Sequence, residues 1–178
     1  MNSIAITAAF FISAITNKLN MTEVHIKGRV FTGVMRGSGI VEYHFHRIVG
    51  LVGFEPFKGT LNIKLERAVD MRHYATKAVE HILLDSTKKI DVLLAPIILT
   101  IKREQEEYYD CWAMRDMRNV YPDDVIELIA RDNLMEKFSL KDDEEVVVTF
   151  FDTGKKKKEV PFMGAMRKLY GTEQRLSV

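Results

Sequence analysis

Hydrophobic and polar residues alternate along much of the chain with the period of two that is typical of β-strands. The clearest run is Thr60–Glu66, where Leu61, Ile63 and Leu65 alternate with polar residues, so that one face is apolar and the other polar. Similar patterns predict further strands at 24–34, 40–49, 91–102, 106–114, 125–130 and 142–151. Pro96 predicts a bulge or bend in its strand. Six or more strands without βαβ repetition predict a mainly β fold, a small closed barrel.

Apolar residues three and four positions apart predict a few helices. Asp70–Leu84 has the stripe of an amphipathic helix, which we expect to cross over between strands. A short helix is expected within Asp132–Phe138, and Met163, Met166, Leu169 and Tyr170 indicate another in the C-terminal tail.

The length and composition predict one domain with two extensions. With 178 residues and 47% hydrophobic content, the chain is long enough for one well-cored domain. We place that domain at residues 24–151, after an N-terminal extension at 1–23 and before a tail at 152–178. The extension contains an apolar run, Ile4–Ile15, that lacks a basic leader and is too short to span a bilayer. It is expected either to pack on the domain as a helix or to precede a true translation start at Met21.

The charge balance argues against large polyanionic partners. With 26 basic and 25 acidic side chains the net charge is +1, which gives no general attraction for nucleic acid or for an anionic membrane. The single cysteine, Cys111, has no partner for an internal disulfide, which fits a reducing cytoplasm. We therefore expect a cytoplasmic monomer that binds neither nucleic acid nor membrane.

Thr60 and Asn62 are the first candidates for chemistry. Two positions apart on a strand, they share the polar face, where a hydroxyl and an amide oxygen would together hold a hard cation. The alternative is that they are ordinary residues of a strand start whose side chains bond to nearby backbone.

Three glycines between residues 33 and 39 predict a loop whose backbone amides approach a ligand, with Arg36 adding positive charge. A plain hairpin is the alternative.

His44 and His46 fall on one face of the next predicted strand, but without a third ligand we assign no metal to them. Tyr108, Tyr109 and Trp112 would stack on a heterocycle or, alternatively, pack across strands.

Two stretches resemble one known family. The residues that match the first signature, G-F-x-P-x-x-G-T-L-N-x-x-L, are Gly53, Phe54, Pro56, Gly59, Thr60, Leu61, Asn62 and Leu65. They are similar to the CTP-dependent riboflavin kinases of archaeal type. A second stretch, Asn119–Val146, is similar to the family's second signature and includes Glu127. The resemblance covers about Val24 to Phe150.

The resemblance implies a fold and a reaction. The fold would be a six-stranded cradle-loop barrel of the riboflavin synthase and kinase type. The reaction would transfer the terminal phosphoryl group of CTP to the 5′-hydroxyl of riboflavin, giving FMN and CDP. Mg²⁺ would be the cofactor, no acid or base residue is assigned, and few conventional catalytic side chains are needed for such a transfer.

The resemblance also implies the site residues, by position in this chain. Thr60 and Asn62 would hold Mg²⁺. The flavin would contact Asn119 and Glu127. The nucleotide would contact Gly33, Val34, Arg36, Gly37, Ser38 and Gly39, and a second stretch of Asp132, Asn133, Leu134 and Met135.

Two departures from the family pattern leave an alternative function open. The glycine loop lacks the family's glutamate, and Asn119 stands where the family has threonine or serine. The alternative is therefore a flavin- or nucleotide-binding barrel that has lost turnover.

Overall fold

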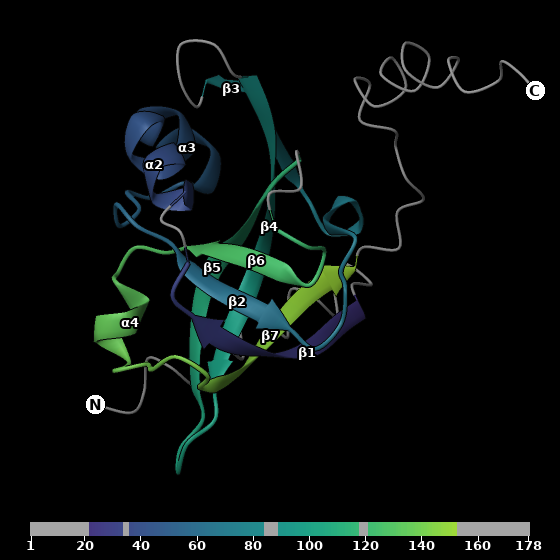
Figure 1. The fold of residues 1–178 in the computed structure, drawn as a ribbon, viewed down its shortest axis with the longest axis vertical. Helices are drawn as coiled ribbons and strands as arrows, with labels where there is room; N and C mark the ends of the chain where they lie inside the picture. Colours follow the sequence, from purple (N-terminus) through teal and green to yellow (C-terminus); the bar gives the residue numbers. More distant parts are fainter. Residues whose placement is uncertain (1–21, 34–35, 84–88, 118–120, 153–178) are drawn as a thin grey trace, which may run out of the picture.

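The computed structural model describes residues 22–33, 36–83, 89–117 and 121–152 (Figure 1). Residues 1–21 and 153–178, which make up most of the two expected extensions and include the expected tail helix, lie outside these residues, as do Val34 and Asn119. The strands are β1 (Thr22–Phe31), β2 (Leu61–Leu65), β3 (Lys77–Leu83), β4 (Lys89–Ile101), β5 (Glu107–Asp116), β6 (Val125–Ile129) and β7 (Glu145–Asp152). The helices are α2 (Arg36–Tyr43), α3 (Phe45–Val52) and α4 (Leu134–Lys137), with a single 3₁₀ turn, η1 (Met71–His73).

Six strands close into an antiparallel barrel, as the sequence predicts. Their order is β4-β5-β6-β2-β1-β7, and β7 pairs back with β4 through Ile97–Ile101. Closure leaves no free edge among these six strands. β3 is an additional strand that pairs with the first half of β4, beyond the part that β7 occupies.

The expected irregularity at Pro96 is absent from the pairing of β4 with β5. The register runs unbroken from Val92 opposite Asp116 to Ile101 opposite Glu107, with Pro96 opposite Trp112. On the other edge of β4, the pairing with β3 extends from Lys89 to Leu94 and the pairing with β7 from Ile97 to Ile101. Pro96 therefore lies in the gap between two partners, where its missing N–H breaks no ladder.

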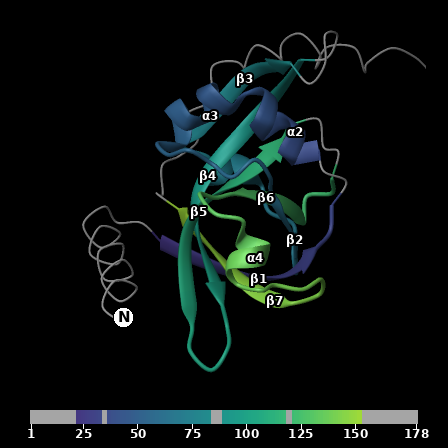
Figure 2. The ribbon, with the colours of Figure 1, turned by 90° about the vertical axis from the view of Figure 1, so that its left-hand side faces the viewer.

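Two hydrophobic cores result from this arrangement. The first fills the barrel and contains the inward side chains of all six strands, among them Ile26, Ile63, Leu99, Ile126 and Val148. The second lies outside the barrel, where α2 and α3 pack against β3, β4, β5 and β6 (Figure 2). Its members are Ile40, Val41, Ile48, Val52, Val79, Val92, Leu94, Met114 and Ile129.

The strand predicted at Ile40–Val49 is wrong, because α2 and α3 occupy this stretch. Its β-branched residues favour a strand locally, but in the folded chain they fill the second core from one side of a helix pair. His44 becomes the N-cap residue of α3 rather than the neighbour of His46 on a strand face. No described helix is both long and apolar enough to cross a membrane.

The crossover helix predicted at Asp70–Leu84 is also wrong. Asp70 accepts a hydrogen bond from the backbone of Arg72 and caps only the short turn η1, after which the chain extends as β3. The apolar stripe is divided between two places: Met71 is buried in the barrel core, whereas Val79 lies in the second core. Pairing with the long strand β4 therefore outweighs the helical periodicity.

Substitution of Ile63 tests the barrel core. Ile63 is fully buried and lies opposite Val30 and Ile126, whereas the next residue, Lys64, is exposed. We predict that Ile63→Ala lowers the free energy of unfolding by roughly 2–5 kcal/mol, because it leaves a cavity. Lys64→Ala should change it by less than about 0.5 kcal/mol. Urea denaturation measures both; equal losses would contradict the assignment of the two faces.

Candidate active site

The site lies on the outer face of the barrel, where β2 pairs with β6. Asn62 is directly opposite Glu127 in this pairing, and the alternation that sends Leu61 and Ile63 into the barrel turns both polar side chains outward. Both are nevertheless buried, with 8% of Asn62 and 6% of Glu127 exposed. β6 lies between β5 and β2, so Glu127 is not on an edge strand. The segment that follows β1 covers this face.

Two glycines let that segment approach closely. A Cβ on Gly33 would lie 2.4 Å from Asn62 Nδ2, and one on Gly37 would lie 2.4 Å from Glu127 Oε1 and 2.8 Å from Thr60 Oγ1. Any larger residue would therefore collide with the site. The Gly37 backbone N–H also donates a hydrogen bond to Glu127 Oε1 at 3.1 Å. Thr60, Asn62 and Glu127 consequently share one small covered space.

The oxygens of this space are suited to a hard cation. Asn62 Oδ1 is buried and has no hydrogen-bond partner in the described structure. A buried acceptor of this kind is costly unless a ligand satisfies it. The Thr60 hydroxyl and the Glu127 carboxylate are the neighbouring oxygens, and Mg²⁺ binds such ligands. The described residues contain no cluster of three His, Cys, Asp or Glu side chains, so no metal centre of that type competes with this one.

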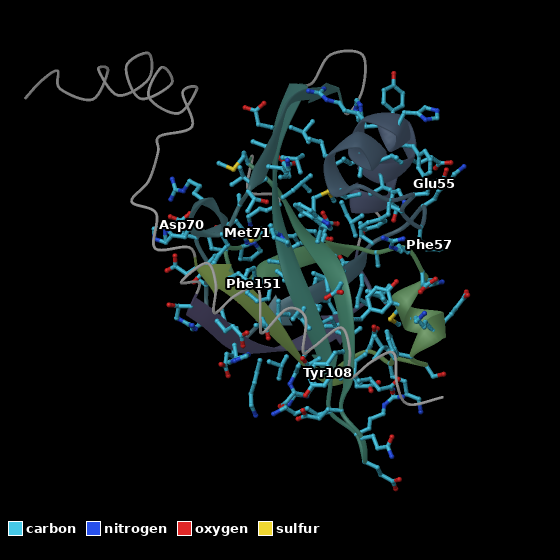
Figure 3. The ribbon with its side chains drawn as sticks, turned by 180° about the vertical axis from the view of Figure 1, so that it is seen from behind. Glu55, Phe57, Asp70, Met71, Tyr108 and Phe151 are labelled. Atoms are coloured by element: carbon cyan, nitrogen blue, oxygen red, sulfur yellow. The ribbon has the colours of Figure 1, made fainter. Side chains whose placement is uncertain are left out.

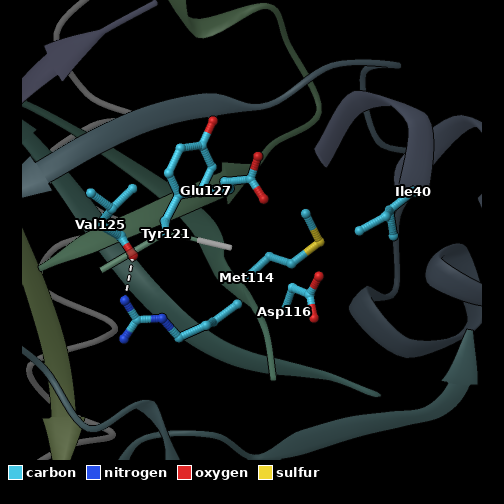
Figure 4. Close-up of a pocket in the computed structure, with 7 residues that line it drawn as sticks. Ile40, Met114, Asp116, Tyr121, Val125 and Glu127 are labelled. Carbon is cyan, nitrogen blue, oxygen red and sulfur yellow. Dashed lines mark hydrogen bonds between the residues drawn. The ribbon is translucent and has the colours of Figure 1, made fainter. Parts of the chain in front are cut away.

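A hollow opens on the β5 side of Glu127 (Figure 4). We call it the Tyr121 hollow. Its walls are Met114 and Asp116 from β5, Val125 and Glu127 from β6, Tyr121 from the connection between them, and Ile40 from α2. It is a small cavity, of about 20 Å³, that combines apolar side chains with two carboxylates.

A second hollow opens on the Thr60 side, beside α4. We call it the Asn133 hollow; it is lined by Phe57, Gly59, Thr60, Leu61 and Asp132–Met135. Phe57 is 42% exposed and lies on the side of the molecule that carries α4 (Figure 3). The Phe57 backbone donates to Ala130 O at 2.8 Å, which fixes this loop to the end of β6. The structure thus brings Thr60 together with the predicted stretch Asp132–Met135.

Asp132 is held by two neighbours. Lys137 Nζ lies 2.5 Å and Tyr109 OH 2.9 Å from Asp132 Oδ2. The hydrogen bond from Lys137 is the main reason that the pKa of Asp132 is below its ordinary value. Burial, together with this hydrogen bond to Asp132, raises the pKa of Tyr109 to about 12. Tyr109 packs edge-on against Phe138, so it follows the packing alternative rather than the stacking one.

The other sequence-predicted residues are placed as follows. The stretch expected to be a glycine loop is partly helical, since α2 begins at Arg36 and Gly37, Ser38 and Gly39 lie in its first turn. A Cβ on Gly39 would meet nothing within 4 Å, so this residue has open space on that side. Of the glycines in this segment, Gly33 and Gly37 contact the predicted site residues.

Several residues of the site were not identified from the sequence. Tyr121, Asp116 and Ile40 line the Tyr121 hollow, and Phe57 lines the Asn133 hollow. Arg115, which lines the Tyr121 hollow, belongs to β5 and is buried. The one available signal was position: Phe57 and Tyr121 each lie inside a stretch that matches a family signature.

Comparisons with known proteins point to one family. The family model CTP-dep_RFKase (Domain of unknown function DUF120) matches residues 30–150. A riboflavin kinase of Saccharolobus solfataricus is 27% identical over 136 residues, which cover 75% of this chain and 77% of the relative. A riboflavin kinase of Sulfurisphaera tokodaii is 27% identical over 131 residues, 72% of this chain and 96% of the relative. A third, from Methanococcus vannielii, is 28% identical over 119 residues, 65% and 89% of the two chains.

The family match spans β2, β6 and both hollows, the parts of the chain that build the site. It covers more than half of the chain. The chain therefore belongs to the CTP-dependent riboflavin kinase family.

Proposed function

We propose that this protein transfers the terminal phosphoryl group of CTP to the 5′-hydroxyl of riboflavin, giving FMN and CDP, with Mg²⁺ as cofactor. Family membership and the riboflavin kinases named among the relatives support the acceptor. The donor is inferred from the family alone.

One geometric observation carries the proposal: each hollow is lined by one of the covered polar side chains. Glu127 lines the Tyr121 hollow and Thr60 lines the Asn133 hollow, and both side chains contact the same residue, Gly37. Phosphoryl transfer requires donor and acceptor on opposite sides of the transferred group, in line. We assign riboflavin to the Tyr121 hollow and the nucleotide to the Asn133 hollow, with the transferred group between them.

Thr60 and Asn62 would hold the cation, and Glu127 lies beside them. When bound, Mg²⁺ neutralises phosphate charge and orients the phosphate oxygens. Because Thr60 and Asn62 are neutral, they leave more of that positive charge to the phosphates than two carboxylates would. The protein's own contribution is mainly position, since the rigid β2–β6 pairing fixes these side chains relative to one another.

Glu127 is suited to orient the acceptor. Its carboxylate is buried and accepts a hydrogen bond from the Gly37 amide, which helps to fix its orientation. A carboxylate has about four acceptor positions, and we assign one of them to a hydroxyl of the ribityl chain. The α2 segment above it would exclude water from the reacting atoms.

The direct test is an assay of FMN formation from riboflavin with CTP or ATP, with Mg²⁺ or with EDTA. We predict FMN with CTP and Mg²⁺, and none with EDTA. Asn62→Leu should lower the rate by at least about a hundredfold, because positioning and charge neutralisation carry most of this catalysis.

Lys64→Leu provides the matched control, because Lys64 lies on the same outer face of β2 but is exposed. It should retain the activity, and both variants should unfold at the wild-type temperature. Riboflavin binding without FMN formation by the wild-type protein would instead favour a binding barrel without turnover. An unfolded Asn62→Leu variant would show that Asn62 is structural.

Glu127→Gln tests the assignment of the acceptor side. The amide keeps the shape of the side chain but loses its charge and part of its acceptor capacity. We predict that riboflavin affinity falls by roughly tenfold, in line with the loss of a hydrogen bond to a charged group, while nucleotide affinity changes little. Fluorescence titration with riboflavin and calorimetry with CTP measure the two affinities. Equal losses would contradict the assignment.

Gly37→Ala tests the close approach of α2. Alanine is favoured over glycine inside a helix, but Gly37 lies in the first turn and its added Cβ would lie 2.4 Å from the buried Glu127 carboxylate. We therefore predict that the variant loses roughly 1–3 kcal/mol of unfolding free energy through overpacking. Because the Cβ would displace Glu127 or Thr60, we also predict a loss of activity of at least about tenfold in the folded protein.

Gly39→Ala is the control in the same helix, because its Cβ has open space. It should be at least as stable as the wild type and keep full activity. If both variants are equally active, the packing of Gly37 does not matter for turnover.

A further inference from the structure

Arg115 is the one buried basic side chain among the residues whose exposure the structure describes, with 7% of the side chain exposed. Its guanidinium group donates to four backbone carbonyls. Nη1 donates to Val69 O at 3.0 Å and to Asp123 O at 3.1 Å, and Nη2 donates to Pro122 O at 2.5 Å and to Val125 O at 2.8 Å (the last bond is dashed in Figure 4).

The charge of Arg115 is balanced mainly by these carbonyls. Asp123 Oδ1 lies 3.2 Å from Nη1, but the Asp123 side chain is 65% exposed, so this ion pair contributes little. Burial lowers the pKa of Arg115, although an arginine remains charged under ordinary conditions. Burying a full charge is costly, so the arrangement calls for a reason beyond filling space.

The four carbonyls belong to two segments that meet beside the site. One is the connection Pro122–Val125, which enters β6, and the other is the segment that follows β2. Backbone bonds join the same segments, from Val69 N to Asp123 O at 2.9 Å and from Leu65 N to Asp124 O at 2.6 Å. Arg115 therefore holds the start of β6 against the segment that follows β2. Its last contact in β6, Val125, lies two residues before Glu127.

The connection Pro122–Val125 also contributes to the lining of the Tyr121 hollow. Tyr121 directly precedes Pro122, and Arg115 itself lines this hollow. The Tyr121 ring contacts Phe31 edge-on, with centroids 6.1 Å apart, and Phe31 lies opposite Asn62. A displacement of the connection would move Tyr121 and Val125 on one side of the hollow without moving α4 or the Asn133 hollow on the other.

We infer that Arg115 is a positioning residue for the riboflavin side of the site: by holding Pro122–Val125 through four carbonyls, it sets the spacing of Tyr121 and Glu127 around the acceptor. This inference rests on the proposed function. Lysine carries the same charge but has one donor group on a flexible chain, so it cannot bond to four carbonyls in two segments at once.

Arg103 offers a matched control on the nucleotide side. Its Nη2 donates to Phe138 O, at the C-terminal end of α4, at 2.6 Å and to Glu144 Oε1 at 2.8 Å. Like Arg115, Arg103 donates to a backbone carbonyl, but this carbonyl is at the end of α4, which lines the Asn133 hollow.

The experiment compares Arg115→Lys with Arg103→Lys. The riboflavin dissociation constant is measured by fluorescence, KM is measured for riboflavin and for CTP, and unfolding is followed thermally. For Arg115→Lys we expect the riboflavin dissociation constant and KM to rise on the order of tenfold, with KM for CTP within about twofold of wild type. Arg103→Lys should leave both riboflavin constants unchanged.

A purely structural role gives a different result. Arg115→Lys would then lower the unfolding temperature but leave riboflavin binding unchanged below it, or would raise both KM values equally; either outcome overturns the inference. If Arg115→Lys does not fold, Pro122→Gly loosens the same connection at an exposed residue, and it too must weaken riboflavin binding selectively. Wild-type protein that neither binds nor phosphorylates riboflavin overturns the proposed function and this inference together. If the wild-type protein binds riboflavin and the variants bind it equally well, the inference about Arg115 is overturned and the proposed function is not.

Discussion

The pairing of β2 with β6 is the constraint on which the rest of the site depends. It places Asn62 opposite Glu127 on the outside of a closed barrel, and the residues on either side of each are fixed in the barrel core. Neither side chain can turn inward without a shift of register that would expose the core. The polar pair is therefore held by the same packing that holds the fold, and little further support is needed to keep its geometry.

Burial of this polar pair follows from the second core. Apolar residues of α2 and α3 pack against the outer face of β3, β4, β5 and β6, and this packing brings the start of α2 down onto Glu127 and Thr60. Glycine at positions 33 and 37 allows the contact. The fold thus builds a small covered space on a barrel wall that would otherwise face water, with one hollow on each side of it.

The barrel and the polar face of β2 could be predicted from the sequence because the alternation in Thr60–Glu66 is a local signal. Glu127 was assigned through the resemblance to a family signature, and its place opposite Asn62 was not predicted. The second core could not be predicted in this way, because Val79, Met114 and Ile129 come from distant parts of the chain. The β-branched residues of Ile40–Val49 consequently indicated a strand. Arg115 was missed for the same reason, since Val69, one of its partners, is 46 residues away.

Binding of a divalent cation by Thr60 and Asn62 together with the nucleotide is measured by electron paramagnetic resonance of Mn²⁺ in place of Mg²⁺. Mn²⁺ and CTP are titrated into the wild-type protein and the Asn62→Leu variant, with Mn²⁺ and CTP without protein as the reference. We expect the wild-type chain to bind one Mn²⁺ beyond this reference, and the folded variant to lose this binding. Equal Mn²⁺ binding by both proteins would contradict this expectation.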